Sequence, residues 1–196
     1  MQLIEKALNE NKASILLVPE ISLTPQTVNR FIARFGKEEI AVLHSKLSVG
    51  ERFDQWHKIH EGKAKIVIGA RSAIFAPVKN LGIVIIDEEH DSSYKSEMAP
   101  RYDAKNVARY ICKTVNVPLV LGSATPDLET FYRAKKEEIM LLELTRRANE
   151  AELPSIDIID LREELAKGNR SMISTRLYKE IEKNLKNRKQ TILYLN

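Results

Sequence analysis

Short apolar runs alternate with amphipathic segments along most of the chain. Apolar, often β-branched runs predict six strands, at residues 14–18, 40–44, 65–69, 82–86, 118–122 and 140–144. Apolar residues at helical spacing predict helices between them, near residues 3–8, 24–35, 49–60, 104–114 and 128–135. Strands that are apolar throughout and are separated by helices indicate a parallel sheet buried on both faces. The pattern therefore predicts an α/β fold.

The alternation is interrupted by a polar stretch, "TRRANEAELP" at residues 145–154, which predicts a linker. Beyond it the β/α pattern restarts, with a strand at 156–160, a helix at 175–187 and a strand at 190–195. We therefore expect a first domain over residues 1–145, a linker over 146–155 and the beginning of a second domain over 156–196. The chain starts in a helix and ends in an apolar strand, so we expect it to be a piece of a longer protein.

Composition narrows the class of protein only modestly. The 196 residues are 43% hydrophobic and 30% charged, which is ordinary for a globular protein, and the net charge of +4 permits a polyanionic partner without requiring one. The single cysteine, Cys112, excludes an internal disulfide and a cysteine-based zinc site within the chain. No apolar run approaches the ~20 residues that span a bilayer, and no signal peptide opens the chain. We expect a cytoplasmic protein.

Candidate chemistry is concentrated in the tetrapeptide "DEEH", residues 87–90, directly after the apolar run 83–86. In an open parallel sheet, ligands bind beyond the carboxyl ends of the strands. An acid at the position of Asp87 can hold Mg²⁺, and Glu88 can orient or deprotonate an attacking water, two roles that phosphoryl transfer needs. From the tetrapeptide alone, a solvated acidic turn is an equally good interpretation.

Three more strand ends carry similar signals. In "VLGSATPDLE", residues 120–129, Ser123 and Thr125 can hydrogen-bond a carboxylate or a phosphate. In "LLVPEISLTPQ", residues 16–26, Ser22 and Thr24 precede a helix, in a position suited to a phosphate backbone. In "IVIGARSAIFAP", residues 66–77, Arg71 and Ser72 occupy the same kind of position. Each signal is weak alone, but four on successive strands favour a ligand-binding edge.

In order, "LLVPEISLTPQ", "GARSAIFAP", "DEEH" and "GSATP" resemble motifs Ia, Ib, II and III of superfamily-two helicases. Residues 69–110 are similar in particular to the primosomal replication-restart helicases. The resemblance covers nearly the whole chain and implies a RecA-like fold of the P-loop NTPase type, with a first motor domain and the start of a second. Two positions depart from the family pattern: Asp103 stands where a histidine is expected, and Ala70 where a hydroxyl residue is expected.

The resemblance implies an ATP-dependent 3′-to-5′ DNA helicase acting in replication restart and primosome assembly. The implied cofactors are ATP and Mg²⁺, with zinc only in a part of the parent protein downstream of this chain. The implied partners are forked and single-stranded DNA, other primosome proteins and single-stranded DNA-binding protein, with no membrane. By motif position, Asp87 would bind Mg²⁺, Glu88 would activate water, and the nucleotide site would be completed by His90, Ser123 and Thr125, which would couple nucleotide state to DNA.

The polar segment 91–102 leaves the predicted catalytic strand and carries Tyr94, Lys95, Arg101 and Tyr102. Aromatic faces can stack on bases while basic side chains meet phosphates, so these residues are candidate DNA contacts. The resemblance favours this role, because the family has an aromatic-rich loop here that senses single-stranded DNA. The alternative is a surface loop whose tyrosines pack on the next helix.

The phosphate-binding pattern G-x-x-x-x-G-K-[ST] is absent from the sequence. The pairs Gly36-Lys37 and Gly62-Lys63 lack the earlier glycine and are followed by Glu38 and Ala64. We therefore expect ATP hydrolysis only in a full-length parent and an inactive chain in isolation. Two other functions stay open: a non-catalytic RecA-like module that binds DNA or protein, and a different superfamily-two DNA translocase.

Overall fold

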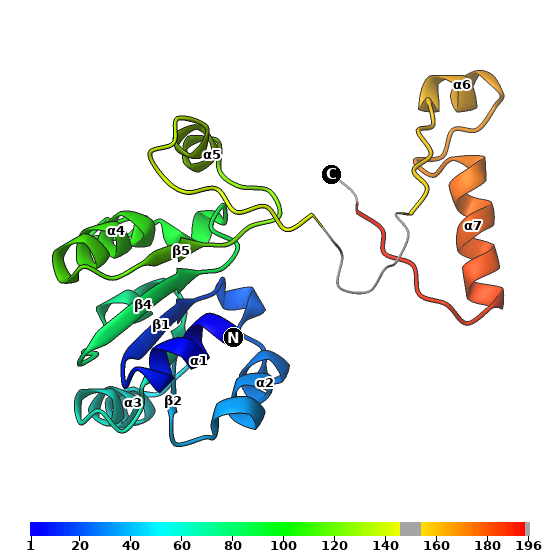
Figure 1. The fold of residues 1–196 in the computed structure, drawn as a ribbon. Coiled ribbons are helices and arrows are strands. Elements are labelled where there is room, and N and C mark those ends of the chain that lie inside the picture. Colours follow the sequence, from blue (N-terminus) through cyan, green and yellow to red (C-terminus); the bar gives the residue numbers. More distant parts are fainter. Residues whose placement is uncertain (146–153, 195–196) are drawn as a thin grey trace. The chain divides into compact units, whose positions relative to one another are not determined.

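The computed structural model describes residues 1–145 and 154–194 and divides the chain into two units, Met1–Leu142 and Glu143–Asn196 (Figure 1). The first unit holds a five-stranded parallel sheet in the order β2-β3-β1-β4-β5. Its strands are β1 (Ala13–Leu17), β2 (Ile40–Leu43), β3 (Ile66–Gly69), β4 (Leu81–Ile86) and β5 (Leu119–Leu121). The predicted α/β fold with a parallel sheet is confirmed.

The described part of the first unit has five α-helices: α1 (Gln2–Asn9), α2 (Pro25–Phe35), α3 (Val49–His60), α4 (Ala104–Val115) and α5 (Leu128–Lys135). Several of these helices begin directly after a residue that caps the helix. The Thr24 hydroxyl accepts a hydrogen bond from the amide of Thr27, with Pro25 as the first residue of α2. Ser48 and Glu51 form a capping box at the start of α3. Local sequence therefore fixes where these helices start.

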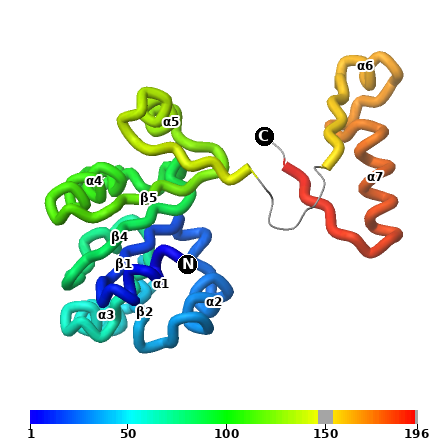
Figure 2. The backbone as a smooth tube through the Cα atoms, viewed as in Figure 1, coloured from blue at the N-terminus to red at the C-terminus, as the bar shows by residue number. Residues whose placement is uncertain are grey.

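Side chains alternate between the two faces of the sheet, and each face has its own apolar cluster. In β1, Ile15 and Leu17 pack with buried residues of α3 and α4, whereas Leu16 and the following Val18 pack with Ile4 of α1 and Phe31 of α2. Helices therefore cover both faces, as Figure 2 shows for the backbone path. This layering explains why the strands of the interior are apolar throughout.

The lone cysteine, Cys112, lies on the inner face of α4, where only 4% of its surface is exposed. Burial raises the pKa of its thiol to about 11. At neutral pH the side chain is therefore a neutral, apolar part of the core.

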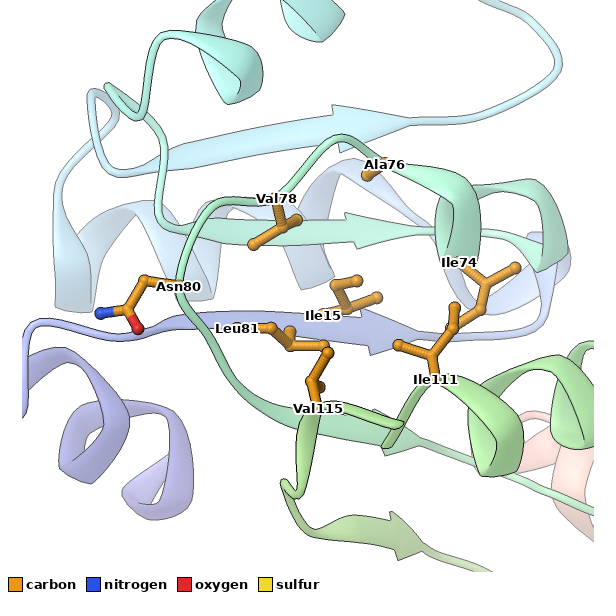
Figure 3. A pocket seen from close by; sticks show the side chains of 8 residues that line it. All are labelled: Ile15, Ile74, Ala76, Val78, Asn80, Leu81, Ile111 and Val115. Carbon is orange, nitrogen blue, oxygen red and sulfur yellow. The ribbon is translucent and has the colours of Figure 1, made fainter. Parts of the chain in front are cut away.

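An apolar cavity of about 340 Å³ lies beside the start of β4 and the end of α4 (Figure 3). Asn80 is the one polar side chain among the residues lining it, and its amide donates to the carbonyl of Asn11 at 2.8 Å. Leu81 opens β4 and Val115 ends α4, so the cavity lies towards the amino ends of the strands.

The described part of the second unit contains two helices, α6 (Leu161–Ala166) and α7 (Thr175–Lys186). Ser174 caps α7 by accepting from the amide of Leu177 at 3.1 Å. The carboxylate of Glu164 in α6 accepts from the amide and the hydroxyl of Thr175, at 2.8 and 2.7 Å. Hydrogen bonds of Glu164 therefore connect α6 to the start of α7.

Three predicted strands are wrong. The described residues within 140–144, 156–160 and 190–195 form no strand; residue 195 and most of the predicted linker, 146–153, lie outside the described residues. Leu144, Ile158 and Ile192 are each at least 95% exposed. A strand satisfies its backbone only beside a neighbouring strand, and no described strand pairs with these runs. Within the described ranges, no helix has the length and apolar character needed to cross a membrane.

Candidate active site

The carboxyl ends of β1, β4 and β5 meet at one edge of the sheet. The amide of Asp87 donates to the carbonyl of Leu17 at 2.9 Å, at the end of β1. On the other side, the amide of Gly122 donates to Ile86 at 2.8 Å, and the amide of Glu89 donates to Gly122 at 3.0 Å. These backbone bonds hold the turn that follows β4 between its two neighbouring strands.

Asp87 and Glu88, the two acids predicted for catalysis, lie directly after β4. The exposed Asp87 carboxylate accepts a hydrogen bond from the amide of Glu88 at 3.1 Å. Glu88 has a φ of 47°, in the left-handed region that non-glycine residues seldom occupy. Backbone strain of this kind is found preferentially at functional sites. A Cβ added at Gly122 would lie 3.5 Å from Asp87 Oδ1, so this glycine is close to the carboxylate without being sterically required.

His90 connects this turn to the segment after β5. Its Nδ1 lies 2.7 Å from the hydroxyl of Ser123 and 3.7 Å from a carboxylate oxygen of Glu88. The Ser123 hydroxyl in turn accepts from the amide of Thr125 at 3.0 Å. The structure thus brings together the five residues predicted for the nucleotide site, although the contact of Thr125 is made by its backbone.

The donor set fits a magnesium ion that is shared with a nucleotide. Mg²⁺ is usually bound through one or two carboxylates, together with phosphate oxygens and waters. The described residues contain no group of three or more histidine, cysteine or acidic side chains able to hold a metal on their own. Asp87, exposed at the strand end, can serve as the protein carboxylate of such a shared site.

The predicted DNA contacts after β1 and β3 lie at the same edge of the sheet. Ser22 is exposed in the short 3₁₀ helix Glu20–Ser22, whereas the hydroxyl of Thr24 is engaged in capping α2. Arg71 and Ser72 begin a second 3₁₀ helix, Arg71–Phe75, and Ser72 is exposed. Ser22 and Ser72 are therefore free to meet a ligand.

A cavity of about 470 Å³, lined by both polar and apolar side chains, opens beside Arg71 and Ser72. Arg52 and Trp56, one turn apart on α3, also line it. Trp56 is 41% exposed, so part of its ring can meet a ligand in this cavity. Sequence reasoning missed both side chains as part of this site, although their spacing of four residues puts them on one face of the helix.

Arg71 anchors the segment 91–103 instead of extending into solvent. Its guanidinium donates to the carbonyls of Ser93, at 3.2 Å, and of Lys95. It also lies over the ring of Tyr102, 5.5 Å from the ring centroid, and that ring meets Phe75 edge-on at 5.1 Å. Arg71 and Tyr102 therefore fix the segment to the 3₁₀ helix after β3.

The predicted stacking of Tyr94 on a base is wrong. Only 1% of Tyr94 is exposed, and its hydroxyl donates to the backbone carbonyl of Asp87 at 2.5 Å. Burial, reinforced by the charge of Asp87, raises the pKa of this hydroxyl above its usual value. The packing alternative holds for this tyrosine, because an aromatic ring is as well suited to a core as to a base. Lys95 and Arg101 on the same segment are exposed.

Comparison with known proteins identifies the family of the chain. The family model described as DEAD/DEAH box helicase matches residues 1–134. Over its full length the chain is 53% identical to the Replication restart protein PriA of Bacillus subtilis (strain 168), and it covers 24% of that protein. It is 43% identical to the protein of the same name from Synechocystis, again covering 24% of it. It is 45% identical to the protein of this name from Treponema pallidum, over 98% of the chain and 28% of that protein.

The chain therefore spans about a quarter of the length of these curated relatives. The family that the motifs predicted is confirmed, since the family model matches residues 1–134 and the relatives are 43–53% identical to the chain. The chain belongs to the DEAD/DEAH box helicase family.

Proposed function

We propose that this chain is a motor segment of an ATP-dependent 3′-to-5′ DNA helicase acting in replication restart and primosome assembly. The observation that carries the proposal is the cluster of Asp87, Glu88, His90 and Ser123 at one edge of a parallel sheet. The identity of 53% to a replication restart protein supports the biological role.

In this proposal, the acids divide the chemistry between them. Asp87 would hold the magnesium ion that accompanies ATP, and that ion would neutralise the negative charge of the phosphates. Glu88 orients the attacking water and accepts its proton. The hydrogen bond between His90 and Ser123 keeps the turn after β4 in register with the segment after β5. Both segments therefore respond together when a nucleotide is present.

The DNA strand is proposed to follow the same sheet edge. Ser22, Ser72, Lys95 and Arg101 are exposed and can donate to phosphates, while Thr24 and Arg71 contribute through the backbone segments that they fix. Tyr102 is partly buried and offers at most one edge of its ring. Phosphate contacts of this kind position a strand without reading its sequence.

The substrates, partners and location in the cell are proposed from the similarity to the relatives. We propose forked and single-stranded DNA as substrates, and primosome proteins and single-stranded DNA-binding protein as partners, acting in the cytoplasm. Zinc is proposed only for a part of the full-length protein downstream of this chain. A strand and phosphate-binding loop from outside this chain are proposed to complete the nucleotide site, so the 196 residues alone should not turn over ATP.

The test is ATP hydrolysis by the full-length protein, with and without single-stranded DNA, and by its Glu88→Gln variant. The variant should bind ATP but lose about 10²- to 10⁴-fold in turnover, since it lacks the carboxylate that accepts the proton. Glu38→Gln, at a side chain that is 90% exposed, is the matched control and should behave as wild type. Near-normal turnover by Glu88→Gln would contradict the assigned role. DNA binding by a full-length protein without any ATP hydrolysis would favour the non-catalytic module.

A further inference from the structure

The turn after β4 holds a buried carboxylate to which the proposed reaction assigns no role. Glu89 is 1% exposed and accepts three hydrogen bonds. They come from the ammonium of Lys105 at 3.1 Å, the amide of Asp127 at 2.6 Å and the hydroxyl of Thr130 at 3.1 Å. A buried charge is tolerated only when it is paired and hydrogen-bonded, and Glu89 meets both conditions.

Lys105 completes the network by also donating to the Asp127 carboxylate at 3.0 Å. Burial lowers the pKa of Lys105, but its hydrogen bonds to Asp127 and Glu89 outweigh burial, and the net pKa is raised above its usual value. The lysine is therefore charged at neutral pH. The network contains one ammonium and two carboxylates, and it joins three segments of chain.

Those three segments are the ones that the proposed function has to coordinate. Glu89 lies between Glu88 and His90, Lys105 lies in the first turn of α4, and Asp127 is the N-terminal cap of α5, just after Ser123 and Thr125. The chain between Glu89 and Lys105 is the segment 91–103. The ion pair therefore closes the base of the segment that carries the exposed Lys95 and Arg101.

We propose that the Glu89–Lys105–Asp127 network is a mechanical joint that couples the segment 91–103 to the hydrolytic turn. Glu89 and Lys105 are positioning residues in this proposal, which rests on the proposed function. When DNA displaces the segment 91–103, Lys105 moves relative to Glu89. Because Glu89 lies between Glu88 and His90 in the chain, a movement of Glu89 also moves these two residues. The second carboxylate, Asp127, carries the same displacement to the segment after β5.

A network of charges suits this role better than apolar packing. Replacing a buried ion pair with apolar residues of similar volume is often neutral for stability, whereas removing one partner is strongly destabilising. Hydrogen bonds fix direction as well as distance, so the pair defines one geometry of the turn. Stability and coupling can therefore be separated by removing both charges together.

The test uses the double variant Glu89→Gln with Lys105→Met in the full-length protein, after thermal unfolding has shown that it is folded. The ratio of DNA-stimulated to basal ATP hydrolysis should fall about fivefold or more, the lower limit of typical coupling between sites. The single variant Lys105→Arg, which retains Glu89 and keeps the positive charge, should show most of the wild-type ratio. Lys58→Met is the matched control: this lysine is 19% exposed in its side chain and donates to the carbonyls of Lys37 and Ile40.

A second measurement separates this proposal from the proposed function. Hydrogen–deuterium exchange of residues 87–103 in the 196-residue chain should accelerate in the double variant and not in Lys58→Met. If DNA does not stimulate ATP hydrolysis by the wild-type protein, the proposed function is refuted. The hydrogen–deuterium exchange result alone then decides whether the network acts as a joint. A folded double variant with the wild-type ratio, or with unchanged exchange in 87–103, overturns the joint.

Discussion

The two units of this chain carry the same sequence pattern, but the described residues of the first unit are buried to a much greater extent than those of the second. Met1–Leu142 buries two apolar clusters, one on each face of its sheet. Among residues 154–194, Ser174 is the only buried residue, and Ile156, Ile158 and Ile192 are all at least 85% exposed. The difference shows that apolar periodicity specifies where an element can form, while neighbouring elements decide whether it does.

Helices and strands respond differently to the lack of neighbours. Helix α7, predicted at residues 175–187, is present as Thr175–Lys186, because a helix pairs its own backbone groups and Ser174 caps it. The runs at 156–160 and 190–194 have the composition of strands, but none of the strands in the described part of the chain pairs with them. Their backbone groups have to be satisfied by solvent instead.

The largest expected effect comes from separating the units. Residues 1–142 alone should unfold in one cooperative thermal transition, because they hold the five described strands of the sheet and both apolar clusters. Residues 143–196 alone should show partial helicity without a cooperative transition, because short helices without a core are marginal in water. Circular dichroism at 222 nm during heating measures both. A sharp transition in the 143–196 fragment would show that this unit has a core of its own.

A matched pair of leucines sharpens the comparison within the intact chain. Leu17→Ala removes a side chain that is 0% exposed in the centre of the sheet, and should lower the free energy of unfolding by about 2–5 kcal/mol. Leu185→Ala, at a position 69% exposed on α7, should change it by less than about 0.5 kcal/mol. Denaturant titration of both variants measures the difference. Equal losses would mean that α7 is packed against an apolar surface.

Helix caps offer a smaller and more local test. Ser48→Ala breaks the capping box of α3 and should cost about 1 kcal/mol in the unfolding of the first unit. Ser174→Ala removes the equivalent cap of α7, which accepts from Leu177. It should reduce the helical signal while leaving the main unfolding midpoint unchanged. A shift of that midpoint in Ser174→Ala would show that the two units unfold together.

The smallest expected effect is a pH dependence confined to the second unit. Hydrogen bonds from the amide of Thr175, and then from the side chains of Asn169 and Thr175, lower the pKa of Glu164 from 4.5 to about 2. A lowered pKa means that these bonds stabilise the α6–α7 arrangement above about pH 4.5 and are lost as the pH falls towards 2. The amide resonance of Thr175 should follow this titration. Glu164→Gln should abolish it, and a midpoint near 4.5 would contradict the hydrogen bonding.

Much of the first unit was predictable because its signals are local. The ends of the five strands in the sheet lie within one residue of their predicted positions, since each apolar run is bounded by polar or turn residues. The cluster of acids after β4 and hydroxyl residues after β5 was also predictable, because parallel strands end at a common edge. The strand predicted at 140–144 failed because a run of apolar residues does not reveal whether it has a partner.

The remaining features of the site depend on contacts between residues far apart in the chain. Glu89 meets Lys105 and Thr130, 16 and 41 residues away, and no periodicity links such positions. Tyr94 stands in a polar stretch, yet its ring reaches the core and its hydroxyl finds the carbonyl of Asp87. A sequence pattern reports average surroundings, whereas burial of one residue in a polar segment depends on the exact path of the backbone.

The burial of Cys112 affects how the chain can be labelled. A thiol reacts as its thiolate, and a buried thiol with a pKa of about 11 is both inaccessible and protonated at neutral pH. The folded chain therefore behaves towards maleimides and similar reagents as though it had no cysteine. A single cysteine introduced at the exposed Glu97 would carry a fluorophore or a spin label on the segment 91–103 alone, and its signal would report the movement of that segment without background from the core.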